Sequence, residues 1–139
     1  MEEFLYIQGL GETYYETVII EYDTPELFTL VSRRGDRYLA VIASSLIEVT
    51  LVPVSVETLK QIFTKKLTVR EAFTKAELAY IVSLADGRAK RVQMSELICK
   101  SNNSTTYLPK EGLSLVYQNE DVLQFLEDHA SFSQIWEVA

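Results

Sequence analysis

Apolar and polar residues alternate along several segments in the first half of the chain, which is the pattern of strands with one face turned toward a core. The alternation runs through residues 14–22, 27–33, 37–43 and 47–51. Pro25 lies between the first two segments and Gly35 between the second and third, and both residue types are typical of tight turns. We therefore expect four strands joined by short connections.

The spacing of apolar residues becomes helical after Pro53. Ser55 can cap a helix, and the residues that follow it repeat at helical intervals. The apolar stripe of this helix consists of Val56, Leu59, Ile62 and Phe63. Thr68 and Glu71 have the spacing of a capping box, which predicts a second short helix ending near Ala76. The sequence thus predicts two short helices after the fourth strand.

Alternation returns in residues 78–84 and 88–94, and the Asp86-Gly87 pair between them favours a hairpin turn. The polar residues 101–106 are expected to form a loop and residues 112–117 a closing strand, after which Asn119 can cap a helix. We predict one α+β domain spanning residues 1–139. Its antiparallel sheet has about five to seven strands built from hairpins, and its C-terminal segment is helical.

Composition agrees with a folded domain, since 47% of the 139 residues are hydrophobic. No apolar run approaches the roughly 18 residues of a membrane-spanning helix, and the acidic Met1-Glu2-Glu3 start differs from the basic start of a secretory signal. We therefore expect a cytoplasmic protein without a membrane partner.

Charge is distributed unevenly along this acidic protein, whose net charge is -7. Residues 1–32 contain seven acidic and no Lys or Arg residues, residues 33–100 contain twelve basic and seven acidic residues, and residues 101–139 contain one basic and six acidic residues. Basic residues cluster at two predicted hairpins. These residues are Arg33, Arg34 and Arg37 in one hairpin, and Arg88, Lys90 and Arg91 in the other.

The basic hairpins have two interpretations. Lys and Arg at strand edges commonly prevent aggregation, and the acidic ends of the chain could lie against its basic middle. Alternatively, the hairpins could bind a nucleic acid or nucleotide, although the acidic overall charge opposes affinity for a polyanion.

Candidate catalytic chemistry is scarce. His129 and Cys99 are the only residues of their types, so a zinc site cannot be assembled from them alone, and no motif joins either to a nucleophile or base. Gly9 and Gly11 precede a predicted strand and lack the third glycine of a dinucleotide-binding loop. We expect no catalytic residues of these classes, no metal site and no cofactor. Chemistry between two carboxylates stays open, because the sequence does not show which acidic residues are buried.

Two aromatic residues near the C-terminus, Phe132 and Trp136, have two interpretations of equal weight. Aromatic side chains are enriched at protein interfaces, which makes the pair a candidate contact for a partner. The alternative is that the C-terminal segment packs on the sheet through them.

Several short motifs resemble a family of small uncharacterised bacterial domains. They are residues 21–28 (EYDTPELF), 35–39 (GDRYL), 51–54 (LVPV), 55–59 (SVETL) and 67–73 (LTVREAF). The resemblance covers residues 14–85, about half of the chain. It implies a bacterial or phage origin and a cytoplasmic protein of unknown function without an assigned catalytic motif.

Taken together, the sequence predicts a non-enzymatic protein-interaction or regulatory module, such as a small subunit of a bacterial or phage multi-protein system. Its expected partner is another protein of unknown identity, and homo-oligomerisation stays open. Nucleic-acid or nucleotide binding through the basic hairpins is the second hypothesis, and a carboxylate-dependent enzyme is the third.

Overall fold

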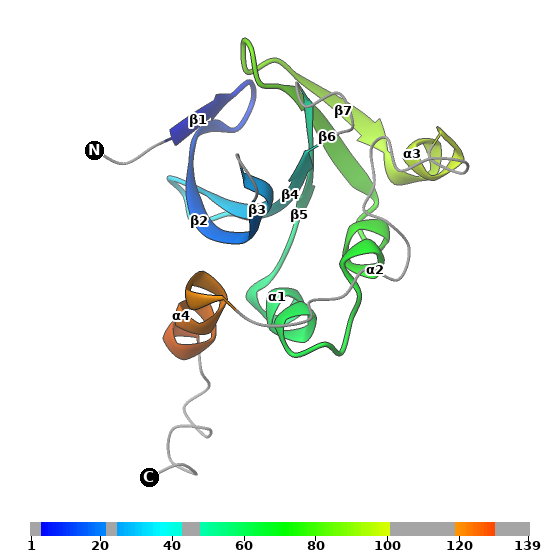
Figure 1. Ribbon diagram of the computed structural model, residues 1–139. Helices are drawn as coiled ribbons and strands as arrows, with labels where there is room; N and C mark the ends of the chain where they lie inside the picture. Colours follow the sequence, from blue (N-terminus) through cyan, green and yellow to red (C-terminus); the bar gives the residue numbers. More distant parts are fainter. Residues whose placement is uncertain (1–3, 22–24, 43–47, 101–118, 130–139) are drawn as a thin grey trace, which may run out of the picture.

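The computed structural model describes residues 4–21, 25–42, 48–100 and 119–129. Within these ranges the chain forms a seven-stranded antiparallel sheet in which neighbours in sequence are neighbours in space (Figure 1). The strands are β1 (Phe4–Ile7), β2 (Gly11–Glu21), β3 (Pro25–Ser32), β4 (Arg37–Ile42), β5 (Glu48–Pro53), β6 (Leu78–Ser83) and β7 (Ala89–Gln93). The helices are α1 (Val56–Phe63), α2 (Val69–Thr74), α3 (Met94–Lys100) and α4 (Glu120–Asp128). The α+β class and the antiparallel sheet are therefore confirmed.

The sheet curls until the end of its first strand meets the start of its last (Figure 1). The N–H of Gln8 donates to the carbonyl of Gly87 at 2.9 Å, and the N–H of Ala89 donates to the side-chain oxygen of Gln8 at 3.4 Å. The curl encloses an inner core. Its buried residues are Ile7, Phe28, Leu30, Tyr38, Ala40, Val49, Leu51 and Val82.

The opposite, outer face of the sheet carries the four helices (Figure 1). An outer core lies between the helices and this face of the sheet. In it, Phe63 of α1 and Phe125 of α4 meet edge to face with ring centroids 5.3 Å apart. The outer core also contains Leu39 and Val52 of the sheet and Leu97 of α3. Since apolar burial is the main favourable contribution to folding, both cores hold the sheet in its curled shape.

Local sequence signals explain several connections. The Ser55 side chain accepts a hydrogen bond from the N–H of Thr58, and Thr68 and Glu71 form both bonds of a capping box. Gly87 has a φ of 74°, a conformation that glycine adopts without steric cost.

Two elements were not predicted. β1 precedes the predicted first strand, so the two helices follow the fifth strand, and α3 begins immediately after β7. The predicted loop 101–106, the predicted strand 112–117 and the residues Phe132 and Trp136 lie outside the described residues. No helix in the described ranges is long and apolar enough to cross a membrane.

Candidate functional site

The first candidate site is a cluster of polar residues on the outer face of the sheet, and a β-bulge in β2 positions one of its members, Glu16. Tyr15 pairs with Leu30 and Thr17 pairs with Thr29, so Glu16 has no residue opposite it on β3. An extra residue in one strand shifts the side chains that follow to the other face. The bulge therefore puts Glu16 and Thr17 together on the outer face, beside α4.

Arg37, the first residue of β4, binds the carboxylate of Glu16 through Nε and Nη2. Its Nε lies 3.0 and 3.1 Å from the two carboxylate oxygens, and its Nη2 lies 2.9 Å from Oε2. The two side chains are only 23% and 19% exposed. Thr29 adds a longer hydrogen bond, of 3.5 Å, from its hydroxyl to Glu16.

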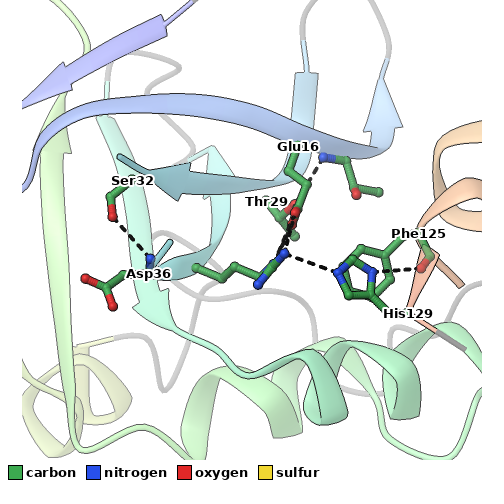
Figure 2. Close-up of polar contacts among 8 residues, drawn as sticks. Glu16, Thr29, Ser32, Asp36, Phe125 and His129 are labelled. Atoms are coloured by element: carbon green, nitrogen blue, oxygen red, sulfur yellow. Dashed lines mark hydrogen bonds and ion pairs between the residues drawn. The ribbon is translucent and has the colours of Figure 1, made fainter. Parts of the chain in front are cut away.

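His129 completes this group from the C-terminal end of α4 (Figure 2). Its ring stacks on Phe125 with centroids 4.3 Å apart, its Nδ1 lies 3.0 Å from the Phe125 carbonyl, and its Nε2 lies 3.2 Å from Nη2 of Arg37. A guanidinium can only donate and a carbonyl can only accept. The geometry therefore assigns a neutral imidazole that carries its proton on Nδ1 and accepts at Nε2.

The Glu16–Arg37–His129 cluster is already internally satisfied. The carboxylate oxygens of Glu16 face Arg37, and each ring nitrogen of His129 has a hydrogen-bond partner. The adjacent hollow has a volume of about 100 Å³ and is lined partly by Asp121 and Asp128. Ligand pockets are typically about 300–1,000 Å³. The cluster thus serves to attach α4 to the sheet.

Metal binding finds no support in the described ranges, where no group of three or more His, Cys, Asp and Glu side chains is arranged to hold an ion. The sequence did not indicate the Glu16–Arg37–His129 cluster, because its three residues come from distant segments.

All three basic residues of the first hairpin have carboxylate partners. Arg37 binds Glu16, as described above. Arg33 lies 3.0 Å from Glu12, and Arg34 lies 3.7 Å from Asp36. The hydrogen bond to the Tyr14 hydroxyl, followed by the charge of Glu12, raises the pKa of Arg33 above its ordinary value.

The second hairpin differs. Arg88 lies 3.6 Å from Asp86, but Lys90 and Arg91 are exposed and form no ion pair with any residue that the structure describes. The first basic cluster lies at the turn between β3 and β4, and the second lies at the turn between β6 and β7. No hydrogen bond or ion pair joins the two clusters within the described residues.

β7 is the second candidate site, because in the described part of the chain it pairs only with β6. Two backbone hydrogen bonds mark the ends of the β6–β7 ladder. At one end the N–H of Ser83 donates to the carbonyl of Arg88, and at the other end the N–H of Met94 donates to the carbonyl of Glu77. Peptide groups in such a ladder alternate between the partner strand and the opposite side. Those of Arg91 and Gln93 therefore point away from β6, as does that of Ala89.

Grooves run along both faces of β7. The outer groove has a volume of about 390 Å³, and its lining includes Glu48, Ile81 and Lys90. The inner groove has a volume of about 380 Å³, and its lining includes Glu77, Leu78, Arg91 and Gln93. We call the outward peptide groups of Arg91 and Gln93, with these two grooves, the β7 edge. The sequence predicted the hairpin and its charges, but it did not show that β7 would pair with β6 alone among the described strands.

Comparison with known proteins finds no matching family model, no matching curated protein and no matching solved structure.

Proposed function

We propose that this protein is a small non-enzymatic interaction module whose contact surface is the β7 edge. The observation that carries the proposal is the pair of outward peptide groups at Arg91 and Gln93, on an exposed strand with a groove on each face. Such a surface suits a subunit or regulator of a larger assembly.

Strand addition explains how this edge would bind a protein. An extended peptide can hydrogen-bond to an unpaired edge strand, while its alternate side chains enter pockets on the two faces. Basic side chains at an edge also protect against aggregation, which is the simpler explanation of Lys90 and Arg91. The grooves favour binding over protection alone, since protection does not require space for a partner's side chains.

The other hypotheses have less support. An enzyme would need a group free to react, and the charged residues of the Glu16–Arg37–His129 cluster bind one another. Binding of a nucleic acid by both hairpins would need basic side chains free to meet phosphates, whereas four of their five arginines face carboxylates.

Gln93→Pro tests the proposed function. Proline lacks an N–H and is tolerated at sheet edges, so this change should remove one outward donor without breaking the β6–β7 ladder. Gln93→Thr is the matched control because it retains the N–H. In affinity purification from the source cells, we expect wild type and Gln93→Thr to retain the same specific protein, and Gln93→Pro to lose it.

Circular dichroism and urea unfolding would establish that the proline variant is folded. Recovery of the same proteins with all three forms, or of none with wild type, would contradict the β7 edge as the contact surface.

A further inference from the structure

We infer that the β7 edge takes an acidic extended segment of a partner protein, which adds to the sheet as an eighth strand; this inference rests on the proposed function. It specifies the chemistry of the partner, which the proposed function leaves open.

The charge at the centre of the edge carries the inference. Lys90 lines the outer groove and Arg91 the inner groove, and neither has an ion pair with a described residue. They contrast with the four arginines of the two hairpins that do face carboxylates. Successive residues of a strand point to opposite faces, so adjacent acidic residues in a bound strand would meet Lys90 and Arg91 separately.

Two acidic residues limit the length of the acidic segment. Glu48 lines the outer groove and Glu77 lines the inner groove, where each would repel a carboxylate nearby. The best complement to the β7 edge is therefore a strand with a short acidic centre and uncharged residues on both sides.

Gln8 indicates where the added strand begins. Its side-chain carbonyl accepts the outward N–H of Ala89 and so takes the place that a partner's backbone carbonyl would occupy. The following outward groups, those of Arg91 and Gln93, form a continuous site next to it. One position of this edge thus already binds an amide in the way that strand addition requires.

Peptide binding to the purified full chain tests the chemistry. The probe is a fluorescent, end-capped peptide of about ten residues, with two adjacent glutamates at its centre and valine and threonine on both sides. The control peptide has two lysines in place of the glutamates. We expect the acidic peptide to bind more tightly, although the protein's net charge of -7 attracts the lysine peptide. We also expect its affinity to fall as salt rises.

Variants locate the binding site. Removing both cations with Lys90→Gln and Arg91→Gln should weaken binding of the acidic peptide about three- to tenfold. Gln93→Pro should weaken it by about tenfold. The matched control, Lys60→Gln with Lys66→Gln, removes two charges near α1 and should change the affinity by less than about twofold.

The outcomes separate the two proposals. Equal binding of both peptides, with loss in Gln93→Pro, would overturn the acidic chemistry and leave the interaction module standing. Peptide binding that Gln93→Pro does not weaken would overturn both. If the protein self-associates and Gln93→Pro abolishes this, the β7 edge binds a second copy of the chain. If single-stranded DNA displaces the peptide and its binding requires Lys90 and Arg91, the β7 edge binds nucleic acid. Either result would overturn the inference.

Discussion

Arg37 joins three segments of the chain through one side chain. It lies on β4, binds Glu16 of β2 and contacts His129 at the end of α4. Water is largely kept from the Arg37–Glu16 pair, so the charges depend on each other more than exposed ions do. His129, the single histidine, therefore helps to hold α4 against the sheet through its contacts with Arg37 and the Phe125 carbonyl.

Replacing Arg37 should reveal this dependence. Arg37→Met leaves the shielded carboxylate of Glu16 without its cation, and we expect the free energy of unfolding to fall by about 2 kcal/mol. Arg34→Met is the control: the Arg34 side chain is 76% exposed and 3.7 Å from Asp36. Its replacement should cost less than about 0.5 kcal/mol. Urea unfolding measures both, and equal losses would contradict the shielded pair.

At the scale of elements, hydrogen bonds join the start of α4 to β2 at the point where the register between β2 and β3 shifts. The side-chain amide of Asn119 donates to the carbonyls of Val18 and Ile19 at 2.9 and 3.1 Å, while its oxygen caps α4. Asp121 accepts the N–H of Val18 at 3.0 Å. The helix therefore supplies partners to peptide groups beside a β-bulge.

Substitution of Asn119 separates its two roles. Asn119→Ala removes the cap and both donated bonds, so we expect a loss of about 2 kcal/mol in the free energy of unfolding. Asn119→Asp retains the capping oxygen but not the donors, and should lose an intermediate amount. Ser55→Ala, which removes a cap alone, should lose about 1 kcal/mol. Thermal and urea unfolding give these values; a neutral Asn119→Asp would show that the donated bonds contribute nothing.

Local chemistry determined which elements could be predicted. The Thr68–Glu71 capping box and the Asp86-Gly87 hairpin depend on neighbouring residues, and sequence patterns contain that information. The short strand β1 and the helix α3 have weaker local signals, because β1 has four residues and α3 directly follows β7. Tyr14 and Val18 share a face under strict alternation, but the bulge at Glu16 separates them.

The candidate site shows the same limit. The sequence located the basic residues of both hairpins but could not show which of them have partners. Glu16 meets Arg37 because of a bulge and a strand pairing, and Lys90 forms no ion pair with the part of the chain that the structure describes. Both facts depend on contacts between segments that are distant in sequence.

At the scale of the whole molecule, Gly87 permits the close approach that curls the sheet. A Cβ at this position would overlap the carbonyl oxygen of Tyr6, and the φ of 74° is unfavourable for other residues. Gly35 has a positive φ of 91° but open space around it. Both glycines therefore need a positive φ, but only Gly87 also lacks room for a Cβ atom.

This pair gives a direct test of closure. Gly87→Ala should lower the free energy of unfolding by more than about 2 kcal/mol, whereas Gly35→Ala should lower it by about 1 kcal/mol from backbone strain alone. Urea unfolding compares the two variants. Equal losses would show that contact between β1 and the β6–β7 hairpin is not needed for stability.

Closure of the sheet also affects how the chain acquires its structure during synthesis. Gln8 and Ala89 are separated by 81 positions, and the ribosome makes the first long before the second. Neighbouring strands in this sheet can pair as they emerge, because each follows its partner in sequence. The contact between β1 and β7 must wait for the β6–β7 hairpin, so we expect the inner core to close late and this long-range closure to slow folding.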